Sequence, residues 1–173
     1  YHWHHPCHEY PMPDPRTKEV WAHSDKLLVS HHPDATKSRS QYLPLLEVAV
    51  AEDKECPRNS FYYARELTFV CQWEKAIAAL KRYLDLPRAT WADERCYAMR
   101  LLSKSYDALG NPGEAIKWGR LAVAESHDTR EPWLDLSILC YKHKNWLESY
   151  STAMSALAIT QKREVYTAEP ASW

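Results

Sequence analysis

The chain has 173 residues, of which 45% are hydrophobic and 26% are charged, and its formal net charge is -1. This length and composition are typical of one soluble globular domain, or of one domain plus a fragment of another. Because lysines and arginines alternate with acids, electrostatics gives no reason to expect a nucleic acid or an anionic membrane as partner. No apolar run approaches the ~20 residues that span a bilayer.

The first 36 residues predict loop and extended chain rather than helix. They hold seven of the nine histidines, and prolines recur at Pro6, Pro11, Pro13 and Pro15, which forbids a continuous helix. One short alternating stretch, Lys26–Val29, could form a strand. We therefore expect an irregular segment over residues 1–36, followed by a different kind of domain.

From residue 37 onward the apolar pattern is helical. The stretch "WEKAIAALKRYL" places its apolar residues from Trp73 to Leu84 on one stripe with a period of 3.6. The pattern predicts helices over 38–52, 59–71, 73–86, 91–109, 112–125, 131–143 and 146–159. Gly110 suits a left-handed helix end, and Asn111 and Asn145 suit N-caps. Connections this short force neighbouring helices into antiparallel hairpins.

Three of these hairpins show an internal repeat. Small residues stand at matched positions of the second helices, and these are Ala76, Ala115 and Ser149. Twelve residues before each stands another small residue: Ala64, Ser103 and Ser137. Small side chains at both places let the two helices of a hairpin cross closely. The alternative is a helical bundle without repeats.

This spacing resembles the tetratricopeptide repeat, whose period is about 34 residues. The interval from Ala115 to Ser149 equals that period, and the interval from Ala76 to Ala115 is five residues longer. The resemblance covers residues 58–160 and implies an all-α, tetratricopeptide-like helical-hairpin solenoid over 37–160, with a tail at 161–173.

Such a solenoid has a concave face that holds a peptide or a protein. The candidate binding residues on the first helices are Tyr63, Arg65, Arg100, Lys104, Trp133 and Asp135. For Arg65, and for Arg130 in "TREPW", an ion pair between successive helices is the alternative role.

The N-terminal "YHWHHPCHEY" offers several metal-binding side chains. A self-contained zinc site is disfavoured, because neighbouring residues of an extended segment point in opposite directions and no CxxC accompanies them. The segment also resembles the W-x-x-x-x-H-E sequence, here Trp3 to His8 and Glu9, that closes the catalytic domain of family-two (GT-A) glycosyltransferases. "LLVSHHPD", "FYYARELTF", "TREPW" and "VYTAEPASW" resemble, in order, the repeat-containing tail of such enzymes.

The resemblance implies that His8 ligates a divalent cation, manganese or magnesium, and that Glu9 lies at the acceptor side of the active site. A full-length parent would use a nucleotide sugar as donor. The chain has no Asp-x-Asp pair for the cation, so we expect it to be inactive by itself and to need no cofactor. Since it does not begin with Met and stops at "ASW", we expect it to be a piece of a longer protein.

Three functions therefore stay open. The first is a non-catalytic scaffold region of a glycosyltransferase, which contacts its own catalytic domain or forms a homo-oligomer. The second is a free-standing adaptor that binds a protein or peptide through residues 37–160. The third is a histidine-rich metal-binding protein. The five scattered cysteines read as reduced packing residues, which indicates a cytoplasmic protein.

Overall fold

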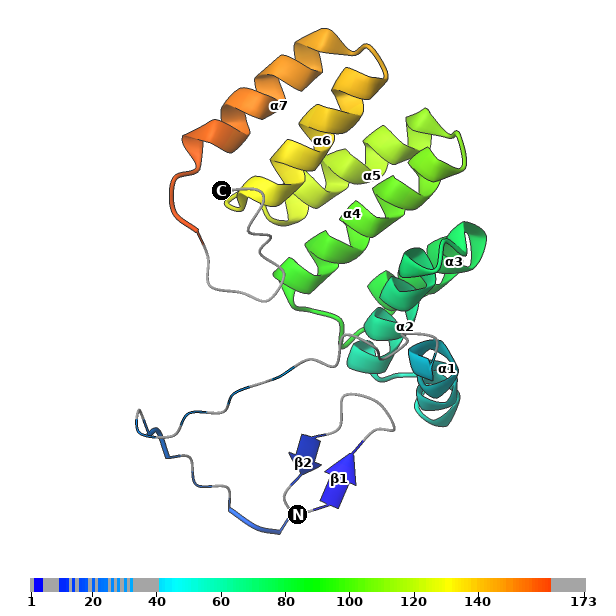
Figure 1. Ribbon diagram of the computed structural model, residues 1–173, viewed down its shortest axis with the longest axis vertical. Helices are drawn as coiled ribbons and strands as arrows, with labels where there is room; N and C mark the ends of the chain where they lie inside the picture. The colour runs from blue at the N-terminus through cyan, green and yellow to red at the C-terminus, as the bar shows by residue number, and fades with distance from the viewer. Residues whose placement is uncertain are drawn as a thin grey trace.

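The computed structural model describes residues 41–162 continuously. Towards the N-terminus it describes residues 2–4, 10–12, 14, 16–18, 20, 22–24, 26, 28, 30 and 32. In these parts the chain forms two short strands and a stack of helices (Figure 1). The elements are β1 (His2–His4), β2 (Tyr10–Met12), α1 (Tyr42–Glu52), α2 (Pro57–Phe69), α3 (Trp73–Asp85), α4 (Ala92–Ala108), α5 (Pro112–Glu125), α6 (Arg130–Lys142) and α7 (Trp146–Ala158).

The helices form three antiparallel hairpins, α2–α3, α4–α5 and α6–α7, preceded by α1. Each hairpin packs on the next, and the first helices α2, α4 and α6 also contact one another in order. The fold is therefore the all-α, tetratricopeptide-like solenoid that the sequence predicts. The successive hairpins rise through the molecule in Figure 1, with α6 and α7 at one end.

One backbone device ends the first helix of every hairpin. Cys71, Gly110 and Lys144 have positive φ values of 56°, 73° and 61°. In each case the next residue donates its N–H to a carbonyl five residues back, at 2.9 Å, as the bond from Asn111 to Tyr106 illustrates. This is the Schellman ending of a helix, in which a left-handed residue turns the chain back. The three positions have the same spacing as the small residues of the repeat, so the backbone repeats with the sequence.

The small residues of the repeat lie where two helices cross. Ala64, Ala76 and Ala115 are fully buried, and Ser103, Ser137 and Ser149 are at most 9% exposed. Around the first two hairpins the core is continuous, with Phe61, Leu80, Tyr83 and Leu102 fully buried in it. A smaller cluster of Val123, Leu136 and Cys140 joins α5 to the last hairpin.

The N-terminal region differs from the expectation in one respect. Lys26 lies in a turn and Leu28 in irregular chain, so the strand predicted at 26–29 is wrong at its two described residues. The strands are instead β1 and β2, paired antiparallel with His2 opposite Met12 and His4 opposite Tyr10. Among the described elements these strands contact only each other.

One of the two expected N-caps forms and the other does not. Asn111 caps α5 as predicted, since its side chain accepts the N–H of Glu114 at 3.2 Å. Asn145 does not cap α7; its amide donates to the carboxylate of Glu148 at 2.6 Å instead. Trp118 packs against the core of the first two hairpins, while Trp91 and Trp146 are 45% and 56% exposed.

The cysteines in the described part of the chain are free thiols, and three of the four are buried. Burial raises the pKa of Cys96 to about 12 and that of Cys140 to about 11, so neither is a thiolate at neutral pH. Only Cys71, at the left-handed turn after α2, is exposed among the four. Cys56, Cys96 and Cys140 are thus the packing residues that the sequence predicts.

Candidate functional site

A groove runs along the first helices of the hairpins. One hollow, about 220 Å³ in volume, lies between α4 and α6 and is lined by Arg100, Ser103, Lys104, Asp107, Asp135, Ile138, Leu139 and Lys142. A second, about 190 Å³, is lined by Phe69, Tyr97, Arg100, Leu101, Lys104 and Asp135. The two hollows share Arg100, Lys104 and Asp135, so we treat them as one concave groove from the end of α2 to the end of α6.

Ion pairs between α4 and α6 build the floor of the groove. The guanidinium of Arg100 donates from Nε to the carboxylate of Asp135 at 2.6 Å, and the Arg100 side chain is only 6% exposed. Its guanidinium also lies 5.3 Å from the centre of the Tyr97 ring. A buried, doubly engaged arginine of this kind positions its neighbours and holds the two helices in register.

The far end of the groove is fixed by Asp107. Its carboxylate accepts the ammonium of Lys142 at 2.8 Å and contacts Nε2 of His143 at 2.7 Å. Although partial burial by itself raises the pKa of Asp107, the bonds from Lys142 and His143 together lower it below its ordinary value. Asp107 therefore stays charged at neutral pH and ties α4 to α6.

Lys104 differs from these residues. It lies between the two hollows and is exposed, and within residues 41–162 it has neither a hydrogen bond nor an ion pair. Phe69 and Tyr97 on one side and Ile138 on the other give the groove apolar walls. The arrangement can thus hold a negative group at Lys104 between two apolar contacts.

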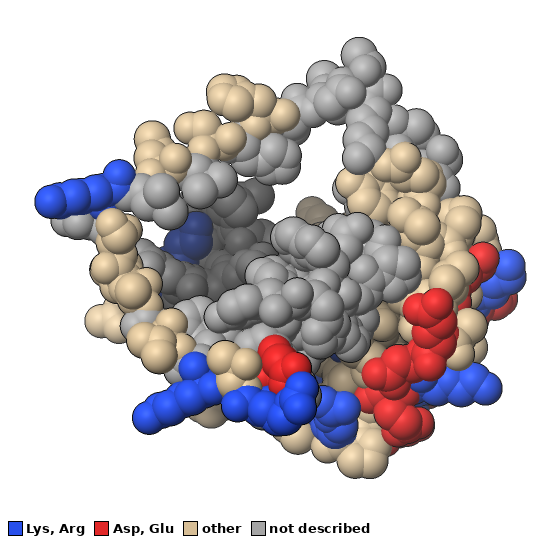
Figure 2. All heavy atoms as spheres, turned by 90° about the horizontal axis from the view of Figure 1, so that it is seen from below, with Lys and Arg blue, Asp and Glu red and all other residues tan. Residues whose placement is uncertain are grey.

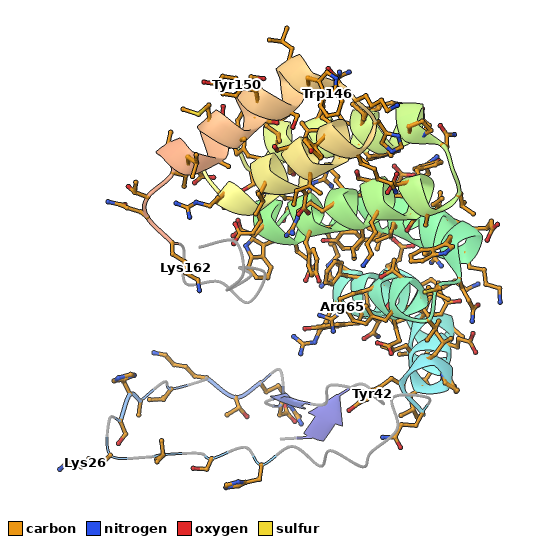
Figure 3. All side chains as sticks on the ribbon, turned by 45° about the horizontal axis from the view of Figure 1, so that its top comes forward. Lys26, Tyr42, Arg65, Trp146, Tyr150 and Lys162 are labelled. Atoms are coloured by element: carbon orange, nitrogen blue, oxygen red, sulfur yellow. The ribbon has the colours of Figure 1, made fainter. Side chains whose placement is uncertain are left out.

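Arg65 extends the basic character of the groove onto α2 (Figure 3). Its guanidinium lies 4.5 Å from the Tyr62 ring centre and 5.7 Å from that of Phe69. Its Nε is buried and has no hydrogen-bond acceptor within the described structure. The expected alternative, an ion pair with a neighbouring helix, is not seen for Arg65 in the part described, whereas Arg130 has a structural role and donates to the carbonyls of Ala156 and Ile159.

The structure thus brings together Arg100, Lys104 and Asp135, with Arg65 adjoining through Phe69. Tyr63 lies elsewhere, in a separate hollow between α1, α2 and α3, and burial, with a contribution from the charge of Glu47, raises the pKa of its phenol. Trp133 packs against the cluster that joins α5 to α6, and its indole N–H donates to the carbonyl of His127 at 2.9 Å. His8 and Glu9 lie outside the described residues.

Sequence reasoning missed several residues that line the groove: Phe69, Tyr97, Ser103, Asp107, Ile138, Leu139 and Lys142. A signal for part of this set was present. Tyr97, Arg100, Lys104 and Asp107 stand at i, i+3, i+7 and i+10, which places them on one face of α4. Following this face of α4 in both directions from Arg100 would have identified Tyr97 and Asp107 as well.

Further properties of the described chain limit the chemistry. No group of three or more His, Cys, Asp or Glu side chains there could hold a metal ion. No helix there is both long enough and apolar enough to cross a bilayer. On the face shown in Figure 2, basic and acidic side chains of the described residues lie beside one another. The groove offers apolar contacts and charged side chains.

Comparison with known proteins supports the fold. No protein-family model matches the sequence, and no curated protein matches it. Among solved structures the chain is similar to a crystal structure of MamA, with 18% identity and a TM-score of 0.60 over 69% of this chain and 62% of that one. It is also similar to PilF of Pseudomonas aeruginosa, with 16% identity and a TM-score of 0.58 over 69% and 53% of the two chains.

A second MamA structure, that of MamA from MSR-1, matches with 14% identity and a TM-score of 0.57, over 69% of this chain and 66% of that one. The chain therefore spans between about half and two thirds of the length of these structures. At such identities the similarity shows the fold alone. It confirms a tetratricopeptide-like helical solenoid and gives no support to a glycosyltransferase parent.

Proposed function

We propose that this chain is a binding adaptor whose concave groove holds a peptide segment of a partner protein. The segment would carry a carboxylate for Lys104 and apolar side chains for the walls formed by Phe69, Tyr97 and Ile138. A solenoid of helical hairpins offers such a surface on its first helices. Affinity would come from the apolar contacts, while the cation would select an acidic partner.

The observation that carries this proposal is the state of Lys104. The neighbouring charges Arg100, Asp135, Asp107 and Lys142 are paired with one another across α4 and α6, whereas Lys104 has no ionic partner in the described chain. An exposed ammonium in a groove that also has apolar walls is free to pair with a carboxylate from outside, and Arg65 offers a second cation at the α2 end.

A peptide array graded in Asp and Glu content, probed with the 173-residue chain, tests the proposal. Acidic peptides with apolar residues should bind, and Lys104→Glu should abolish their signal because it reverses the charge at the centre of the groove. Lys117→Glu is the matched control, since Lys117 lies on α5 and pairs with Glu114 instead. Equal binding by both variants, or no preference for acidic peptides, would contradict the proposal.

The alternative parent, a sugar-nucleotide-dependent glycosyltransferase, stays a prediction. It rests on the sequence around His8 and Glu9, which the structure does not describe. The same groove would then bind a segment of the catalytic domain. An upstream reading frame that encodes neither an Asp-x-Asp pair nor an α/β pattern would remove this parent and leave the adaptor.

A further inference from the structure

The last hairpin exposes an apolar face at positions that are covered in the hairpin before it. Tyr150 and Leu157 of α7 are 68% and 65% exposed, and Figure 3 shows Tyr150 on the outer surface of α7. The matched residues one repeat earlier, Ile116 and Val123, pack against α6 in the cluster that includes Trp133. On α5 this apolar face is covered by the next hairpin, whereas on α7 the same face is exposed.

We call this surface the terminal face and define it by six residues: Leu134, Ile138, Tyr141, Tyr150, Met154 and Leu157. Ile138, Tyr141 and Met154 are 59%, 66% and 49% exposed, while Leu134 is half-buried at the edge of the face. Trp146 adjoins the face through an edge-on contact with Tyr141, with ring centres 5.2 Å apart. The face thus combines large apolar side chains from both helices of the last hairpin.

The positions in the second hairpin that match the other four residues of the terminal face are charged. Arg100 and Asp107 of α4 pair with α6, and Arg120 of α5 pairs with Glu148 of α7 at 2.6 Å. One repeat later, Leu134 stands at the position of Arg100 and Tyr141 at that of Asp107. In the same way, Met154 stands at the position of Arg120 and Ile138 at that of Lys104. The charged residues with which the second hairpin holds the last hairpin are therefore replaced by apolar side chains on the terminal face.

We infer that the terminal face binds the terminal face of a second copy of this chain, in a two-fold dimer. Contiguous exposed apolar surface marks an interaction site. Suppose that a further hairpin docked on the terminal face as the last hairpin docks on the second. Its residues equivalent to Asp135, Lys142 and Glu148 would then meet apolar side chains, and their charges would be left unpaired. A second terminal face brings no such charge, and two-fold symmetry makes the same patch serve both copies.

The size of the face agrees with this occupant. Six large side chains, two of them aromatic and most at least half exposed, present on the order of 700 Å² per copy. A stable protein–protein interface buries roughly 800 Å² per partner. Trp146 and the edges of α6 and α7 supply the remainder, so the contact reaches the size of a stable interface.

Sedimentation equilibrium of the full chain at 1–100 µM tests the inference. We expect a dimer whose dissociation constant rises by about a hundredfold or more in the double variant Tyr150→Lys, Leu157→Lys, because two charges enter an apolar contact. Leu121→Lys is the matched control, since Leu121 on α5 is 40% exposed and lies outside the terminal face. Far-ultraviolet circular dichroism checks that all variants keep their helices.

A wild-type chain that stays monomeric at 100 µM would overturn the inference, as would a dimer that the double variant leaves intact. A chain that ends at Lys162 tests whether residues 163–173 occupy the face instead of a second copy. If the full chain is monomeric and the shortened chain dimerises, residues 163–173 cover the face, and the two-copy interface is wrong for the full chain. Ile138 also lines the groove, so peptide binding is measured on the double variant as well, whose changed residues Tyr150 and Leu157 do not line it. Loss of the dimer with peptide binding kept, or the reverse, then separates the two proposals.

Discussion

The hydroxyl of Ser103 on α4 donates a hydrogen bond to the backbone carbonyl of Ala115 on α5, 2.8 Å away. The same bond recurs one repeat later, from Ser137 to the carbonyl of Ser149 at 2.9 Å. Each joins the two small residues at which the helices of a hairpin cross. In these two hairpins the repeat therefore preserves a buried hydrogen bond between the helices, in addition to the short distance between them.

Removing this bond should weaken the second hairpin. We expect Ser103→Ala to lower the free energy of unfolding by about 1 kcal/mol, the usual net contribution of a buried hydrogen bond. In the first hairpin, Ala64 stands at the matched position, fully buried. Ala64→Ser should stay within about 1 kcal/mol of the wild type if its hydroxyl reaches the carbonyl of Ala76, whereas an unpaired buried hydroxyl would cost about 1–3 kcal/mol. Urea unfolding distinguishes these outcomes.

The left-handed helix ends predict stabilising substitutions. Cys71 and Lys144 have positive φ, which costs a side-chain-bearing residue about 1–2 kcal/mol. Glycine removes most of that cost, but part of the gain in stability is lost because glycine makes the unfolded chain more flexible. We expect Cys71→Gly and Lys144→Gly each to raise the free energy of unfolding by about 0.5–1 kcal/mol.

Gly110, at the matched turn, provides the reverse experiment. An added Cβ would meet no atom within 4 Å there, so Gly110→Ala tests the backbone conformation alone. It should destabilise by about 1 kcal/mol. Thermal melts that place all three variants on the same side of the wild type would show that the turns do not govern these energies.

Much of the solenoid could be predicted because helical periodicity and short connections are local signals. The predicted helix from 112 to 125 agrees with α5, and that from 73 to 86 ends one residue beyond α3. The β hairpin could not be predicted in this way. Its strands are only three residues long, too short for an alternating pattern to indicate them, and β2 contains Pro11, which the edge strands of a two-stranded sheet tolerate.

The groove was only partly predictable for a different reason. Helix positions place Arg100 and Asp135 each on a first helix, but their contact depends on how α6 stacks against α4, 35 residues later in the chain. That geometry comes from the packing of whole hairpins. The pairing of Asp107 with Lys142 and His143 has the same origin, so no local pattern indicated it.

The pairing of Asp107 also predicts a dependence of stability on pH. Because its pKa in the folded state lies below the ordinary value of 3.8, folding favours the ionised form. The resulting stabilisation is complete above about pH 5 and is lost as the pH falls through the folded-state pKa. Asp107→Asn should therefore lower stability at pH 7 and flatten its decline below about pH 4. Urea unfolding of both proteins at each pH measures the two curves, and curves that run parallel below about pH 4 would contradict a role for Asp107.

The close crossing of the helices predicts a severe effect of a bulky residue. Ala115 is fully buried and its carbonyl accepts the Ser103 hydroxyl, so Ala115→Phe must force α4 and α5 apart. Overpacking of a core usually costs about 1–3 kcal/mol, and here it also breaks the hydrogen bond. Ala124→Phe is the control, because Ala124 lies on the exposed side of the same helix. The Ala115→Phe variant should melt at a lower temperature and with less cooperativity than Ala124→Phe. Identical melting curves would show that the small residues of the repeat do not set the distance between the helices.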